Sequence, residues 1–178
     1  PTVLVGPAYE VCDDDYDGIG SYDLSTLDET LLDGQTGVSI SYYESQEDAD
    51  NAANVLDVNY QNTIADNQIL YVRLEVDETG CYATTTQELI VHPLPEIIIP
   101  TPLEECDDDY DGIVSFFDLS QKTEEILNGQ TGISVSYYET IENAESSENP
   151  IEALYTNIEV DNQILYVRLE VDETGCYA

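Results

Sequence analysis

Hydrophobic and polar residues alternate along much of this chain with the two-residue period of β-strands. In the segment GVSISYYES, Val38, Ile40 and Tyr42 alternate with the residues between them. In QILYVRLEV (68–76), every second residue from Leu70 onward is apolar. The following DETG predicts a turn, and residues 82–91 predict a second strand, so that 68–91 is expected to form a hairpin.

Two short segments interrupt this pattern with helical signals. Ser120 is placed to cap QKTEEIL, and Gly129 stands just beyond the end of that segment. The segment SQEDADNAAN is expected to supply another short helical turn. The sequence therefore predicts strands with a few short helical turns between them.

An internal repeat divides the chain in two. Residues 66–83 and 161–178 have the same sequence, DNQILYVRLEVDETGCYA, and Gly34–Gly37 corresponds to Gly129–Gly132. The repeat predicts modules over 1–94 and 95–178. Between them, PLPEIIIPTPLEE is proline-rich and expected to be extended, with EIIIP as the first strand of module two and TVLVG as the first strand of module one.

The second module lacks one element of the first. After its DETGCYA, module one continues with TTTQELIVHPL, which predicts a last strand, whereas module two ends at Ala178. Two explanations are open: the chain is a piece cut at this point, or a neighbouring chain completes the edge. About seven short strands in ~95 residues, with a pair of cysteines, predict an all-β protein of two tandem immunoglobulin-like β-sandwich modules.

The net charge of the chain limits the classes of binding partner that we expect. The chain carries 39 acidic and 3 basic residues, a formal net charge of −36. Nucleic acids and anionic membrane surfaces require a basic face, so we expect neither as a partner. No apolar run approaches the ~20 residues of a membrane span, so no membrane insertion is expected. Either this charge is simply solvated, or divalent cations belong to the folded state, which the patterned aspartates favour.

The four cysteines fall into equivalent pairs, because Cys12 corresponds to Cys106 and Cys81 to Cys176. Of the three possible pairings, the repeat favours Cys12–Cys81 and Cys106–Cys176, each stabilising its module by roughly 4 kcal/mol in the chain-entropy model. A Cys81–Cys106 bond would break the equivalence and is less favoured, and buried free thiols are a further alternative. Disulfides indicate an oxidising compartment outside the cytoplasm.

The motif CDDDYDG occurs at 12–18 and at 106–112. Its alternate aspartates and glycine match D-x-D-x-D-G, the first half of an EF-hand-like calcium loop. A tightly curled loop directs alternate carboxylates at one centre, and hard oxygen ligands favour calcium. The predicted ligands are Asp13, Asp15, Asp17, Ile19 through its carbonyl and Asp23 in module one, and Asp107, Asp109, Asp111, Ile113 and Asp118 in module two. The alternative is a solvated acidic turn.

The DETG turn offers further candidate ligands. If Cys12 is bonded to Cys81, this turn lies beside the acidic loop, and Asp77 or Glu78 approaches the same cation. Asp172 and Glu173 are the equivalent residues of module two. The equally weighted alternative is that the turn is merely exposed to solvent.

Catalysis finds little support in the sequence. His92 is the only histidine and has no counterpart in module two. No GxSxG motif or glycine-rich phosphate loop is present, and the paired carboxylates lack an aromatic sugar platform. We therefore expect no enzymatic activity.

The combination of CDDDYDGIVSFFDLS, ILNGQTGISVSYYET and LYVRLEVDETGCYA, with a strand ending in PLP, resembles the repeats of very large cell-surface and secreted proteins of Bacteroidota. Such chains commonly end in gliding-motility-associated or type IX secretion sorting domains, and none is present here. The resemblance covers nearly the whole chain, except that module two lacks its last strand. It implies tandem immunoglobulin-like modules of an exported adhesin, stalk or filament, and it supplies no ligand.

We therefore expect a non-enzymatic structural or adhesive repeat at the cell surface or in the extracellular space. Calcium and disulfides would make each module rigid, and the neighbouring repeats would be its partners. One alternative is a calcium-dependent adhesion module that binds a glycan or a protein. Another is strand exchange into a filament through the open edge of module two.

Overall fold

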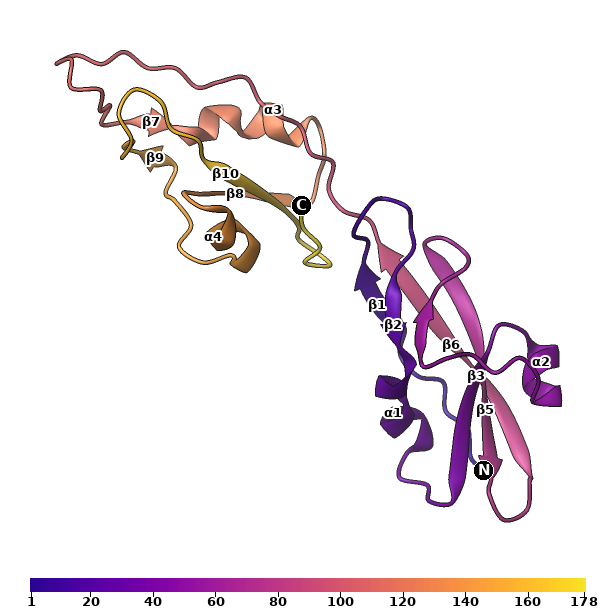
Figure 1. Cartoon of the computed structure of the whole chain (residues 1–178). Helices are drawn as coiled ribbons and strands as arrows, with labels where there is room; N and C mark the ends of the chain where they lie inside the picture. Colours follow the sequence, from indigo (N-terminus) through magenta and orange to yellow (C-terminus); the bar gives the residue numbers. More distant parts are fainter. The chain divides into compact units, whose positions relative to one another are not determined.

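The computed structural model describes residues 1–178, which form two compact units, Pro1–Pro93 and Leu94–Ala178. The structure is mostly β-sheet with a few short helices, so the expected class of two tandem immunoglobulin-like β-sandwich modules is confirmed. Figure 1 shows the elements of both units. None of the helices is long and apolar enough to cross a membrane.

The first unit contains six strands. They are β1 (Tyr9–Cys12), β2 (Ser21–Asp23), β3 (Val38–Tyr43), β4 (Asn59–Gln61), β5 (Asn67–Val76) and β6 (Tyr82–His92). One sheet has the order β1-β6-β5-β3, and β2 pairs with β4 in a second sheet. The predicted hairpin is confirmed, since β5 and β6 pair antiparallel from Asn67 opposite Ile90 to Glu75 opposite Tyr82. On its other side, β6 runs parallel to β1.

The core of the first unit lies between its two sheets. The alternation in β5 places Leu70, Val72 and Leu74 fully inside. Leu89 of β6 and Tyr22 of β2 belong to the same buried cluster. The apolar period of two is therefore the pattern by which the sequence selects the inner face of this sheet.

Short helices connect some of the strands. The first unit has a 3-10 helix (η1, Leu24–Leu27), α1 (Asp28–Leu32) and α2 (Gln46–Asn51). The expected turn at SQEDADNAAN is α2, whose cap is Ser45. The expected helix at QKTEEIL is a 3-10 helix (η2, Leu119–Lys122) followed by α3 (Thr123–Leu127). Its cap is Asp118 rather than Ser120, because the Asp118 carboxylate accepts the Ser120 N–H.

The expected first strands are wrong in both units. Residues 2–6 and 96–100 form no strand, and β1 begins only at Tyr9. Pro7 and Pro100 lack the N–H that a sheet ladder requires. The side chains of Val5 and Ile99 are accordingly exposed.

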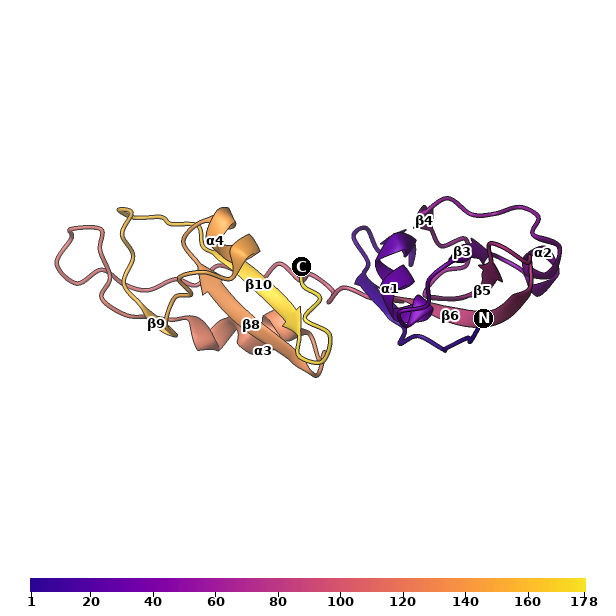
Figure 2. The same ribbon diagram turned by 90° about the horizontal axis from the view of Figure 1, so that it is seen from below.

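The second unit is built of fewer paired strands. β8 (Ile133–Tyr138) pairs with β10 (Tyr166–Val171), and β7 (Phe117–Asp118) pairs with β9 (Leu154–Tyr155). Figure 2 shows α4 (Ile141–Ser146) beside the β8–β10 pair, which it contacts. No strand takes the place of β6.

The same ten-residue sequence forms a strand of ten residues in the first unit and of six residues in the second. Residues 162–171 repeat the sequence of β5, yet only the last six form β10, and residues 162–165 are unpaired. Residues 103–106, which correspond to β1, form no strand either. Both losses lie where β6 supplies hydrogen bonds in the first unit, so the missing neighbour accounts for them.

Truncation of equivalent leucines tests this difference. Leu70 of β5, opposite Gln87 of β6, is fully buried, so we expect Leu70→Ala to lower the free energy of unfolding of its unit by about 2–5 kcal/mol. Leu165 is only partly buried, so we expect Leu165→Ala to cost clearly less. Urea unfolding monitored by hydrogen exchange in each unit measures both, and equal costs would contradict the difference in packing.

Candidate functional site

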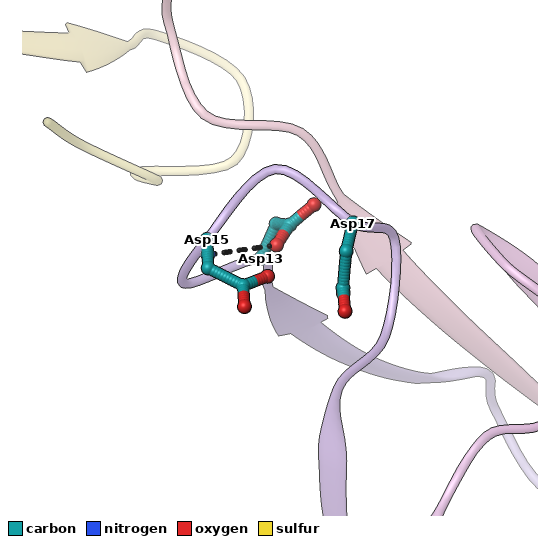
Figure 3. Close-up of side chains that lie close together, drawn as sticks. All are labelled: Asp13, Asp15 and Asp17. Atoms are coloured by element: carbon teal, nitrogen blue, oxygen red, sulfur yellow. Dashed lines mark hydrogen bonds between the residues drawn. The ribbon is translucent and has the colours of Figure 1, made fainter.

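The acidic loop of the first unit begins directly after β1 and is organised around Asp13 (Figure 3). The backbone N–H of Asp13 donates to the carbonyl of His92 at 2.8 Å, which anchors the loop to the end of β6. Its carboxylate accepts hydrogen bonds from the backbone N–H groups of Asp15, Tyr16 and Gly18 at 2.9–3.1 Å. Asp13 is therefore a buried structural centre of the loop, with 6% of its surface exposed.

Backbone conformation closes this loop tightly. Tyr16 and Gly18 have φ values of 68° and 76°. A Cβ on Gly18 would stand 2.6 Å from Oδ1 of Asp66. Glycine is needed here because its backbone enters the left-handed region freely and no side chain fits.

Three carboxylates gather in this loop. One oxygen each of Asp13, Asp15 and Asp17 can be chosen so that all three lie within 4.8 Å of one another. This confirms the expected convergence of the alternate aspartates, and oxygen donors at this spacing suit a hard divalent cation. Whether an ion binds stays a prediction.

The pKa values of Asp13 and Asp15 shift in opposite directions. Desolvation raises the pKa of the Asp15 carboxyl, and the neighbouring charge of Asp17 raises it further. Desolvation also acts to raise the pKa of Asp13, but the backbone N–H donors, led by that of Asp15, outweigh it, and the net pKa is lowered. The backbone of the loop thus stabilises the ionised form of Asp13, whereas the surroundings of Asp15 disfavour its ionised form.

The second unit repeats the loop with a difference. Asp107 accepts the backbone N–H groups of Asp109, Tyr110 and Gly112. The three grouped carboxylates are those of Asp107, Asp108 and Asp109. Asp111 does not belong to that group, although its charge is the largest cause of the raised Asp109 pKa.

The remaining predicted ligands lie outside these groups. Asp23 and Asp118 use their carboxylates to accept the N–H and hydroxyl of Ser25 and Ser120, at the start of the two 3-10 helices. The N–H groups of Ile19 and Ile113 donate to Asp17 and Asp111. Asp77 and Asp172 accept the hydroxyls of Ser39 and Ser134. Glu78 and Glu173 are in neither carboxylate group.

The cysteines do not follow the equivalence of the repeats. Cys12 and Cys176 are both disulfide-bonded, whereas Cys81 and Cys106 are free thiols and exposed. The predicted pairs Cys12–Cys81 and Cys106–Cys176 are therefore wrong, because each would join a bonded cysteine to a free one. The argument that placed the DETG turn beside the acidic loop fails with them.

An arginine at the same place in each unit was not recognised from the sequence. Arg73 donates to the carbonyls of Ala49 and Asp50 at the end of α2, pairs with Glu75 and lies 3.4 Å from the ring centre of Tyr82. In the second unit Arg168 makes the corresponding contacts, with Ala144, Glu145, Glu170 and Tyr177. The available signal was that two of only three basic residues stand at equivalent positions.

These observations define a tandem β module whose distinguishing chemistry is its pattern of disulfide bonding. The chain belongs to the Flavobacterium inter-domain disulphide bond domain family, whose model matches residues 8–95 and again 102–178. A comparison with curated proteins finds no match. The family description names a disulfide bond between domains, so the family is one of structural disulfide domains.

The opposite pKa shifts of Asp13 and Asp15 predict that replacing each by asparagine changes the melting temperature in opposite directions. A raised pKa means that ionised Asp15 opposes folding, so Asp15→Asn should raise the melting temperature at pH 7 in metal-free buffer. A lowered pKa means that ionised Asp13 stabilises the fold above its unfolded value of 3.8, and this stabilisation is lost as the pH falls through the folded value. Asp13→Asn should therefore lower the melting temperature at pH 7.

Both differences should shrink below about pH 3, where the wild-type carboxyls are protonated in the unfolded chain. Thermal melts from pH 7 to pH 2.5 measure this. Shifts of the same sign for the two variants would show that the loop charges do not act as described.

Proposed function

We propose that the chain is a non-enzymatic structural module of an extracellular repeat array, in which a Cys12–Cys176 disulfide ties one repeat to the next. The observation that supports this is the asymmetry of the cysteines: the early one is bonded in repeat 1 and the late one in repeat 2. The family description, a disulfide between domains, names the same kind of bond. Such bonds persist in oxidising compartments outside the cytoplasm.

The same pairing between successive repeats would also give the free thiols of Cys81 and Cys106 a role. If the early cysteine of one repeat bonds the late cysteine of the following repeat, the partner of Cys81 belongs to a preceding repeat and that of Cys106 to a following one. Both thiols are exposed, as residues awaiting a partner must be. Joining each pair by thiol–disulfide exchange transfers two electrons and two protons to a disulfide oxidant, which leaves as two thiols. A chain of repeats linked in this way would resist unravelling at every junction.

The bond should contribute strongly to stability. It closes a loop of more than 160 residues, which corresponds to about 5 kcal/mol in the chain-entropy model. We expect Cys12→Ser to lower the free energy of unfolding by about 3–5 kcal/mol and to free the thiol of Cys176. Cys106→Ser is the matched control in the equivalent position and should change stability little.

Alkylation of the oxidised, denatured chain followed by mass spectrometry measures the pairing. Two thiols should be labelled, at Cys81 and Cys106, and a cross-linked peptide should contain Cys12 and Cys176. Labelling of Cys12 or Cys176, or equal losses of stability in the two variants, would overturn the proposed bond.

Calcium is the cation that we propose for the acidic loops. The support is the set of three carboxylates in each loop within 4.8 Å on a chain of net charge −36. Bound calcium would offset both the desolvation and the repulsion from Asp17 that raise the pKa of Asp15. The loop would then be a stiffening clamp at the end of β1.

Calcium should therefore raise the melting temperature and reverse the effect of Asp15→Asn. At a concentration ~100 times the dissociation constant, binding to one site stabilises by about 2.7 kcal/mol. In calcium the wild type should exceed Asp15→Asn in stability, and in chelator the order should invert. Melts with magnesium at the same ionic strength control for screening, and an unchanged order would refute the site.

Adhesion is the second candidate, with a glycan or protein as ligand and calcium at the contact. Its support is the sequence resemblance to exported surface proteins and the open carboxylates of the loops. The disulfide pattern favours the structural role, since a bond between repeats holds the array itself together and needs no ligand.

A further inference from the structure

Cys81 and Cys176 lie at the end of the same tight turn in the two units. In the first unit, the N–H of Val76 donates to the carbonyl of Cys81 at 2.9 Å, and the N–H of Gly80 donates to the carbonyl of Val76 at 2.8 Å. The corresponding hydrogen bonds of the second unit, both 2.8 Å long, join Val171, Gly175 and Cys176. Because Cys176 is disulfide-bonded and Cys81 is a free thiol, the turn has these hydrogen bonds whether or not its cysteine is bonded.

The residue after each of these cysteines is a tyrosine whose ring lies on a guanidinium group. Cζ of Arg73 is 3.4 Å from the ring centre of Tyr82. Arg168 and Tyr177 repeat this contact at 3.3 Å. We call each of these two pairs an Arg–Tyr stack. Both tyrosines are partly exposed and both arginines are buried, so the turn holds each cysteine on one side and a buried cation holds the next residue on the other.

Hydrogen bonds fix the guanidinium of each Arg–Tyr stack. Arg73 donates from Nη1 to the carbonyls of Ala49 and Asp50 at the end of α2, at 2.8 and 3.1 Å. Its Nε donates to the Glu75 carboxylate at 2.9 Å. Corresponding bonds fix the second stack at the end of α4. A planar guanidinium can donate within its plane and stack on its face at the same time, so the ring of Tyr82 lies on a platform that is attached to both helix and sheet.

We propose that the Arg–Tyr stacks are positioning elements for disulfide formation by Cys81 and Cys176, the cysteines that precede the two tyrosines. The inference rests on the disulfide between repeats proposed above, and it adds the residues that prepare the late cysteine for that bond. A thiol that is already held in place loses less conformational freedom when it is bonded, so its effective concentration toward its partner is higher. The free Cys81 is then ready for its bond without any rearrangement of its turn.

Oxidised glutathione is the disulfide that we use to measure this positioning. In the reduced chain, the thiolate of Cys12 or Cys176 attacks the disulfide of glutathione and expels one glutathione thiol. The other thiolate then attacks the mixed disulfide and expels the second, so that two electrons pass to glutathione. The equilibrium constant of this exchange reports the effective concentration of the two thiols. A residue that only stabilises the fold raises the melting temperature and leaves this constant unchanged.

Replacing the tyrosine of each Arg–Tyr stack tests the proposal on the full chain. We expect Tyr177→Leu to lower the equilibrium constant for forming the Cys12–Cys176 bond about tenfold, and Tyr177→Phe, which keeps the ring, to stay within about twofold of wild type. Tyr82→Leu is the matched control, because it removes the same stack beside the free Cys81, and it should leave the constant unchanged. Glutathione buffers of graded ratio, quenched by alkylation and read by mass spectrometry below the melting temperature, measure all four chains.

Hydrogen exchange gives a second readout that does not require the bond or the Tyr177→Leu chain to fold. In the wild type, the N–H groups of Val76 and Gly80 should be as protected beside free Cys81 as their equivalents are beside the bonded cysteine. In Tyr82→Leu they should exchange about tenfold faster, and unchanged exchange would overturn the proposal.

The glutathione measurement also separates this inference from the proposed function. A wild-type chain that never forms the Cys12–Cys176 bond would overturn the proposed disulfide and this inference with it. A bond that forms in the wild type and is equally stable in Tyr177→Leu, or is weakened equally by Tyr82→Leu, would overturn the positioning role alone.

Discussion

Backbone pairing along β6 is the interaction on which the rest of this fold depends. The strand completes hydrogen bonding for β5 on one side and for β1 on the other. Its carbonyl at His92 also anchors the acidic loop through Asp13. Where a counterpart of β6 is absent, the same ten residues that form β5 yield only the six-residue β10. Local sequence therefore permits the strand, and its neighbour determines its length.

Much of this fold could be predicted from the pattern of residues, because the apolar alternation acts locally. The hairpin of β5 and β6 and the helix α2 were expected where they occur, whereas the cap expected at Ser120 is Asp118. The strands expected at 2–6 and 96–100 were wrong, because an apolar run does not show whether a nearby proline lets it join a ladder. The carboxylate cluster was expected for Asp13, Asp15 and Asp17 and occurs there, but the same spacing in the second unit groups Asp107 with Asp108 and Asp109 instead.

The cysteine pairing could not be predicted in the same way. Symmetry between repeats shows which cysteines are equivalent, but it does not show whether equivalent bonds close within a repeat or between repeats. Cys12 is bonded, whereas its equivalent Cys106 is free. Cys176 is bonded, whereas its equivalent Cys81 is free, so the expected equivalence does not hold. A sequence of only two repeats does not distinguish bonds within each repeat from bonds between repeats. The ligand roles of Asp23 and Asp118 had the same weakness, because a capping aspartate and a metal ligand have the same residue type.

The two repeats differ both in their cysteines and in their sheets. A repeat closed upon itself would have its own disulfide, its own complete sheet and no unused surface. Here the first unit has a complete sheet and an exposed thiol at Cys81. The second has an exposed thiol at Cys106 and unpaired residues at 162–165. Unsatisfied backbone groups and a partly exposed core leucine are costly in an isolated domain. The first unit shows what removes this cost, since β6 pairs with β5 from Asn67 to Glu75 and Leu70 is fully buried there.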